Sequence, residues 1–141
     1  MIPPVERSDE AGDGGPPAGE SAYDLLRRGT ALLGKRHHAQ AAVVLQRAAS
    51  LEPRRGSILE PLGRAYFMSG QLDRAHETFA DLLEVDPTSP YGHYALGRTL
   101  ARLGRRSEAV THLRLAVALA PASRLYRGAL ERLISVEGRG E

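Results

Sequence analysis

The apolar residues of this chain from position 21 onward are grouped into seven short segments, with Gly, Pro or Ser between one segment and the next. Alanine, leucine and arginine dominate these segments, and no long run of β-branched residues occurs. This composition favours helices over strands, and the segments end near a glycine or proline that stops a helix. The pattern therefore predicts seven helices and no sheet, over the ranges 21–34, 38–52, 57–70, 73–86, 89–104, 107–121 and 123–136.

Residues that favour a helix start stand at the beginning of most of these segments. Ser21 with Asp24, and Ser57 with Glu60, have the spacing of a capping box, in which two residues bond reciprocally at the first turn. Pro61 lies about four residues inside the third helix, where we expect a loosened first turn rather than a broken helix. Single residues that can cap or stabilise a first turn mark three further helices: Asp73, Ser89 followed by Pro90, and Ser107.

Four kinds of position recur three times at a constant spacing of 34 residues. A period between about 20 and 50 residues is typical of stacked repeats, in which each unit buries its apolar face on its neighbours. The glycines and alanines of two series allow the two helices of a unit to approach closely. We therefore predict an all-α solenoid. The series are Gly29, Gly63 and Gly97; Ala41, Ala75 and Ala109; Leu45, Phe79 and Leu113; and Pro53, Pro87 and Pro121.

Paired helices with this period and this set of small, bulky and proline positions resemble the tetratricopeptide repeat. The resemblance implies a right-handed superhelical solenoid of antiparallel helix hairpins. It divides a domain of residues 21–137 into three repeats, 22–55, 56–89 and 90–123, and a capping helix over 123–136.

The first repeat departs from this pattern at two positions. Arg28 stands where the second and third repeats have Leu62 and Leu96, and Arg36 stands where they have a loop glycine. The geometry of the first hairpin is therefore the least well specified of the three.

The resemblance also implies a function, because the first helix of each repeat lines a concave groove that binds other proteins. Arginine offers paired, charge-assisted bonds to carboxylates, and aromatic rings offer rigid apolar area. We expect a non-catalytic adaptor or scaffold whose partner is another protein, bound through an acidic, mixed acidic-apolar or extended segment. The groove residues implied are Tyr23, Arg27, Thr30, Arg64, Phe67, Tyr91, Tyr94, Arg98 and Arg102, with Glu60 as the single acid among these groove positions.

One narrower version of this function is not supported by the residues. Members of the family that hold the acidic C-termini of heat-shock chaperones use Lys, Asn and Arg at five groove positions. None of the five positions holds the matching residue type in this chain, so a co-chaperone of that kind is not expected. The five positions hold Leu26, Thr30, Pro61, Tyr91 and Ala95.

The charge of the chain is unevenly distributed. Residues 1–20 hold five acids and one base, a net charge of −4. Because the net charge of the whole chain is +2, the remaining residues carry a net charge of +6. This first segment is rich in Pro and Gly, and we expect it to be disordered. It lacks the apolar stretch of a secretory signal, and no membrane span is found, so a cytoplasmic location is expected. Eighteen of the 19 basic residues are Arg, as a GC-rich, bacterial genome would produce.

Three alternatives remain at this stage. The acidic first segment or a second copy of the chain could occupy the groove, giving a tail-regulated or self-associating scaffold. Clustered arginines with nearby tyrosines could bind nucleic acid, although no recognised motif is present. The five histidines show no metal-ligand spacing, and we predict no catalytic residues, no metal and no cofactor. The arginines of the nucleic-acid alternative are Arg98, Arg102, Arg105, Arg106 and Arg114.

Overall fold

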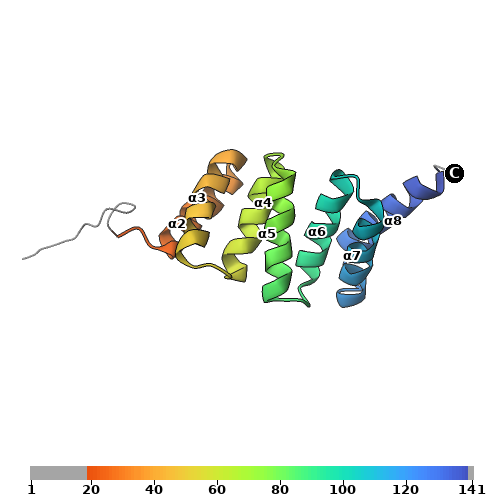
Figure 1. Cartoon of the computed structure of the whole chain (residues 1–141). Coiled ribbons are helices and arrows are strands. Elements are labelled where there is room, and N and C mark those ends of the chain that lie inside the picture. The colour runs from red at the N-terminus through yellow and green to blue at the C-terminus, as the bar shows by residue number, and fades with distance from the viewer. Residues whose placement is uncertain (1–18, 140–141) are drawn as a thin grey trace, which may run out of the picture.

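The computed structural model describes residues 19–139 of the chain, with side chains to residue 135. These residues form helices joined by short turns, without a strand (Figure 1). The predicted all-α fold is confirmed. The expected disordered segment lies outside the described residues, apart from its last two positions. The helices are α2 (Ala22–Gly34), α3 (His38–Leu51), α4 (Gly56–Met68), α5 (Leu72–Val85), α6 (Pro90–Arg102), α7 (Arg106–Leu119) and α8 (Arg124–Arg139).

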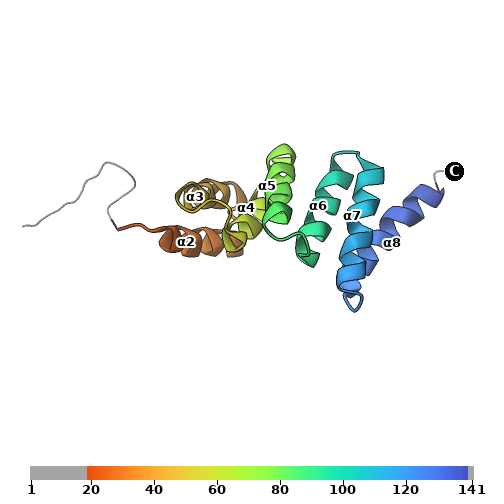
Figure 2. The same ribbon diagram turned by 60° about the horizontal axis from the view of Figure 1, so that its bottom comes forward.

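The helices pack as three consecutive hairpins, α2 with α3, α4 with α5, and α6 with α7, which stack in sequence order. The first helices of successive hairpins also touch, α2 with α4 and α4 with α6. We call the surface formed by the exposed sides of α2, α4 and α6 the first-helix face. Helix α8 packs beside α7 at the C-terminal end of the stack (Figure 2).

The glycine series explains how close the two helices of each hairpin lie. A Cβ atom at Gly29 would lie 2.5 Å from Cγ of Leu45, and one at Gly97 would lie 2.8 Å from Cγ of Leu113. In the middle hairpin, a Cβ at Gly63 would collide with the ring of Phe79. Glycine is therefore required at this repeat position, because the bulky residue of the second helix occupies the space of a side chain.

Two of the predicted helix starts are confirmed. Ser21 accepts a bond from the Asp24 backbone, and the Asp24 carboxylate accepts one from the Ser21 backbone, which is the expected capping box. Ser89 caps α6 by accepting a bond of 2.9 Å from the backbone of Gly92, with Pro90 as the first helical residue. Pro61 is buried within α4, which runs unbroken from Gly56 to Met68, so the prediction of an unbroken helix is confirmed. The expected loosening of the first turn is wrong, because the backbone N–H of Leu59 bonds to the Arg55 carbonyl at 2.8 Å.

The predicted capping box at Ser57 and the predicted cap at Ser107 are wrong, and of the two roles predicted for Asp73 only the charge stabilisation is confirmed. Helix α4 begins at Gly56 with Arg55 before it, so Ser57 and Glu60 form no capping box. Helices α5 and α7 follow the N-cap residues Gln71 and Arg105 without a side-chain cap, so neither Asp73 nor Ser107 caps. Asp73 lies in the first turn of α5, where its negative charge favours the helix.

The turns inside the hairpins explain two of these errors. Gly70 has φ +82°, and the next backbone N–H, that of Gln71, bonds back to the carbonyl of Tyr66 at 2.8 Å. This arrangement closes α4 and at the same time places Gln71 as the N-cap of α5. Gly104 repeats this turn after α6. Arg36 does so after α2 with φ +66°, so an arginine takes the left-handed position that glycine takes elsewhere.

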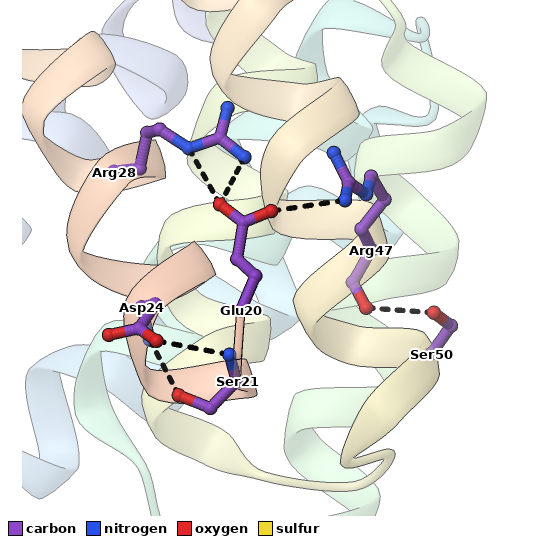
Figure 3. A network of polar contacts seen from close by, with 6 residues as sticks. All are labelled: Glu20, Ser21, Asp24, Arg28, Arg47 and Ser50. Atoms are coloured by element: carbon purple, nitrogen blue, oxygen red, sulfur yellow. Dashed lines mark hydrogen bonds and ion pairs between the residues drawn. The ribbon is translucent and has the colours of Figure 1, made fainter. Parts of the chain in front are cut away.

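The N-terminal end of the stack accounts for the other departure of the first repeat. Leu62 and Leu96 are buried, because a preceding repeat covers this position. No described helix precedes α2, and here Arg28 binds the carboxylate of Glu20 at 2.5 Å, while Arg47 of α3 binds its other oxygen at 3.2 Å (Figure 3). An ion pair thus replaces apolar burial at the end of the stack.

Candidate functional site

An aromatic pocket of about 140 Å³ lies on the first-helix face between α4, α5 and α6. The Tyr91 ring meets Phe79 edge-on, with ring centres 6.2 Å apart, and lies 6.1 Å from the ring of Tyr94. Burial raises the pKa of the Tyr91 hydroxyl, and the nearby Arg64 guanidinium opposes this shift. The pocket combines rigid ring surface with cations at its rim. Its lining is Arg64, Phe67, Met68, Phe79, Tyr91, Tyr94, Ala95 and Arg98.

Two arginines of α6 lie against the aromatic ring contributed by α4. The guanidinium carbons of Arg98 and Arg102 are 4.7 Å and 5.2 Å from the centre of the Phe67 ring, and Arg98 also lies 5.5 Å from the centre of Tyr94. These two positions are one helical turn apart, so both side chains reach the same face. A cation held over a ring keeps the N–H groups at its edge available to an anion.

A second pocket of about 340 Å³ continues this surface toward the C-terminal end. It shares Phe67 and Arg98 with the aromatic pocket, and α8 forms its far wall. We call it the arginine pocket, since three guanidinium groups surround a mainly apolar floor. Its lining is Phe67, Arg98, Ala101, Arg102, Leu113, Ala129, Arg132 and Leu133.

Some arginines of the described segment 19–135 form ion pairs, and those of the two pockets do not. Arg28, Arg47, Arg54, Arg55 and Arg105 each bind a carboxylate. Within residues 19–135, no acid forms an ion pair with an arginine of either pocket: Arg64, Arg98, Arg102 and Arg132.

The structure brings six of the nine sequence-predicted groove residues together in these pockets. Phe67 and Tyr94 are more enclosed than surface residues, with 8% and 6% of their areas exposed. They form the base of the surface, while the arginines form its rim. The six residues are Arg64, Phe67, Tyr91, Tyr94, Arg98 and Arg102.

The other three predicted residues lie apart on α2. Tyr23 is 66% exposed, with the Arg27 guanidinium 5.9 Å from its ring centre. The Thr30 hydroxyl donates to backbone carbonyls of its own helix, at Leu26 and Arg27. Thr30 lines a separate pocket of about 380 Å³ that includes Arg64. This half of the first-helix face has no aromatic floor.

Sequence reasoning missed the contribution of α8. Ala129, Arg132 and Leu133 line the arginine pocket but belong to no repeat, so no repeat position pointed to them. The available signal was the amphipathic pattern of α8, in which residues three and four apart share one face.

A histidine pair, His93 and His112, connects the two helices of the third hairpin. Nε2 of His93 lies 2.8 Å from the carbonyl oxygen of Pro87, which can only accept, so this nitrogen carries the proton. Nδ1 of the neutral His93 ring is therefore an acceptor, and Nδ1 of His112 donates to it at 3.0 Å. Burial lowers the pKa of His112, and the neighbouring His93 lowers it further.

On the side of the stack formed by α3 and α5 lies a pocket of about 630 Å³. Its base is apolar, with Leu59 and Leu62, and its rim carries charges of both signs, such as Arg74 and Asp81. Burial and the nearby Glu84 and Glu77 raise the pKa of Asp81, although Arg54 opposes them. No single ligand charge is favoured here.

Family models of the tetratricopeptide repeat match residues 32–98 and 90–123. The chain belongs to the tetratricopeptide repeat (TPR) family. It is 33% identical to Superkiller complex protein 3 of Mus musculus over 100 residues, and 33% identical to tetratricopeptide repeat protein 7A of Homo sapiens over 92 residues. These alignments cover 71% and 65% of this chain, which spans only 6% and 11% of the two relatives.

Solved TPR structures confirm the solenoid fold. The first TPR domain of Spaghetti (RPAP3), bound to the HSP90 peptide SRMEEVD, has a TM-score of 0.79 at 13% identity and covers 84% of this chain and 94% of that one. YrrB, a TPR protein with an unusual peptide-binding site, has a TM-score of 0.77 at 27% identity and covers 81% of this chain and 59% of its own.

TPR proteins are generally interaction modules without catalytic activity. Among the described residues, none of the helices combines the length and apolarity needed to cross a membrane.

Proposed function

We propose that this protein is an interaction module that binds an acidic-apolar segment of a partner protein on its first-helix face. The observation that carries the proposal is the aromatic pocket formed by Phe67, Tyr91 and Tyr94, rimmed by Arg64 and Arg98. Rings of this kind provide the central anchor of many interfaces, because they bury a large area with little loss of side-chain freedom.

The charges at the rim favour an acidic ligand. Arg64 and Arg98 form no ion pair within residues 19–135, so a carboxylate arriving there would not have to displace an existing partner among them. Charge-assisted bonds from arginine to a carboxylate are about twice as strong as neutral ones. An apolar side chain between the rings and a carboxylate at the rim would satisfy both features of the pocket.

The neighbouring structures support peptide binding but not a particular peptide. RPAP3 was solved with an HSP90 peptide, and YrrB carries an unusual peptide-binding site. The positions at which TPR proteins hold chaperone C-termini have Leu26, Thr30, Pro61, Tyr91 and Ala95 here. The partner we propose is therefore defined by its acidic and apolar side chains, not by a chaperone terminus.

An array of randomised peptides with acetylated and amidated ends tests the proposal. The protein should select peptides containing both acidic and apolar residues. The Arg64→Ala/Arg98→Ala variant should bind the selected peptides at least about tenfold more weakly, since each charge-assisted bond contributes about 1.5–3 kcal/mol.

The matched control is Arg114→Ala/Arg127→Ala, which removes the same charge from exposed positions on α7 and α8. Circular dichroism should show unchanged helix content in both double variants. Equal losses in the two variants, or selection without any acidic preference, would overturn the proposal.

A further inference from the structure

We infer that α8 completes the ligand site, and that the arginine pocket receives an acidic side chain of the bound segment next to the apolar one. This inference rests on the proposed function and adds to it a second subsite, its ligand chemistry and a residue outside the repeats, Arg132. The subsite consists of three guanidinium groups above an apolar floor.

The charge of the arginine pocket defines the sign of its ligand. Arg98, Arg102 and Arg132 line it without an acidic residue in its wall, and none forms an ion pair with a residue of the described segment 19–135. Three guanidinium groups at one pocket repel one another, and an anion between them relieves this repulsion. The pocket is thus complementary to one or two carboxylates.

The floor distinguishes an acidic side chain from a chain terminus. Ala101, Leu113, Ala129 and Leu133 present apolar surface beneath the guanidinium groups. The methylene groups of Glu or Asp can cover such a floor while the carboxylate meets the arginines. A terminal carboxylate is attached directly to Cα, so only the separate side chain of the last residue, and not the group that carries the charge, could cover the floor.

The Arg132 guanidinium lies over a glycine one turn earlier in α8. A Cβ atom at Gly128 would lie 3.3 Å from Nη1 of Arg132, so this guanidinium folds back along its own helix above residue 128. Gly128 thereby leaves room for the charged group beside the wall formed by Ala129 and Leu133. Helix α8 acts here as a lining element of the site in addition to capping the stack.

The arrangement of the two pockets sets the order of side chains in the ligand. Both pockets include Phe67 and Arg98, so a single arginine over a single ring forms the boundary between them. In an extended peptide, side chains on the same side repeat about every 7 Å. The acidic residue should therefore stand about two residues from the apolar anchor.

The test uses the best peptide from the end-blocked array and a second version in which Asp becomes Asn and Glu becomes Gln. Fluorescence anisotropy gives the affinity of both for the wild type, Arg132→Gln and Arg127→Gln. Arg127→Gln is the matched control, because it removes the same charge from α8 about 140° around the helix from Arg132. Arg132→Lys tests whether the planar, forked group is needed.

We expect Arg132→Gln to weaken the acidic peptide about tenfold and the amide version less than about twofold. Arg127→Gln should leave both affinities unchanged, and Arg132→Lys should fall between Arg132→Gln and the wild type. Equal losses for the two peptides, or no loss in Arg132→Gln, would overturn the assignment of this pocket. Binding restricted to a version with a free C-terminal carboxylate would replace the acidic side chain by a terminus and also overturn it.

The proposed function and the subsite fail in different ways. If Arg64→Ala/Arg98→Ala abolishes binding but Arg132→Gln changes nothing, the groove is functional and only the α8 subsite is wrong. If no array peptide binds the wild type, or if the double variant binds as well as the wild type, the proposed function is wrong and the subsite falls with it.

Discussion

The two junctions between repeats have the same helix arrangement, but the large side chain at the contact comes from the first helix of the following repeat at one junction and from the second helix of the preceding repeat at the other. Where α3 meets α4, a small Ala49 accompanies a large Ile58, which is 3% exposed. Where α5 meets α6, 34 residues later, a large Leu83 accompanies Gly92. A Cβ atom at Gly92 would lie 2.8 Å from Cδ2 of Leu83, so the leucine fills the place of the missing side chain.

The two junctions also differ in what lies next to them on the side formed by the second helices of the repeats. The first junction has the pocket of about 630 Å³, whose lining includes Ala49, Leu59 and Thr78. Leu59 and Thr78 correspond to His93 and His112 one period later, and there the two rings stack with centres 5.3 Å apart. One set of repeat positions thus lines open space beside the first junction and forms a hydrogen-bonded pair inside the third hairpin, next to the second junction.

The first-helix face differs between the two ends of the stack for a related reason. Tyr23 and Tyr91 occupy the same repeat position in the first and third repeats. Tyr91 packs on Phe79 of the preceding repeat, whereas no described helix precedes α2, and Tyr23 remains 66% exposed. A residue's role in this solenoid therefore depends on its neighbour in the stack as much as on its repeat position.

The largest expected effects come from mixing the two junctions. Gly92→Ile should lower the free energy of unfolding by about 3 kcal/mol, because the new side chain collides with Leu83 and also approaches Ser89. Leu83→Ala should lower it by about 2 kcal/mol, because it removes a packed side chain. The double variant recreates the pairing of Ala49 with Ile58, so its loss should be smaller than the sum by about 1–2 kcal/mol.

Urea unfolding followed by circular dichroism measures this coupling. A control cycle that combines Gly92→Ile with Thr111→Ala, an exposed position on α7, should be additive. Additive losses in the Leu83 and Gly92 pair would show that the reversed placement of the large side chain does not govern the second junction.

A smaller effect should separate the two tyrosines of the same repeat position. Tyr91→Ala removes the edge-on contact with Phe79 and should cost about 2 kcal/mol of unfolding free energy. Tyr23→Ala should change it by less than about 0.5 kcal/mol, because the ring is mainly in solvent. Thermal melts of the two variants compare them directly, and similar losses would contradict the role given to the preceding repeat.

The fold could be predicted from the sequence because its determinants are local and periodic. Glycines, prolines and the constant spacing divide the chain into helices, and the glycine and bulky series identify the contact inside each hairpin. The starts of α5 and α7 could not be obtained from Asp73 or Ser107, because the turn around Gly70 or Gly104 sets where the next helix begins.

The site was predicted only as far as it follows repeat positions. Arg98 and Arg102 of α6 could be placed in this way, whereas Arg132 of α8 could not, because it lies outside every repeat. The reversed order of large and small residues at the two junctions could not be predicted by comparing positions within one repeat either. The pairs are Ala49 with Ile58, and Leu83 with Gly92. The reversed order becomes visible only when residues of adjacent repeats are known to touch.

The smallest expected effect concerns the histidine pair and its dependence on pH. Burial and the facing His93 lower the pKa of His112 in the folded protein; His76 of α5 acts in the same direction, while Glu108 on its own helix opposes them. Below about pH 6.5, an unfolded chain binds this proton more readily than the folded one. The contribution of His112 to the free energy of unfolding should therefore be fully present above that pH. It should decrease as the pH is lowered toward the reduced pKa of the folded state.

Urea midpoints between about pH 7.5 and about pH 5 test this in the wild type, His112→Gln and His37→Gln. The amide that His112→Gln introduces can still donate to His93 but does not titrate, so this variant should flatten the fall in midpoint. His37→Gln, which alters an exposed histidine in the first hairpin turn, should keep the wild-type profile. If all three profiles coincide, the pair contributes no pH dependence, and the contrast with Leu59 and Thr78 one period earlier is one of packing alone.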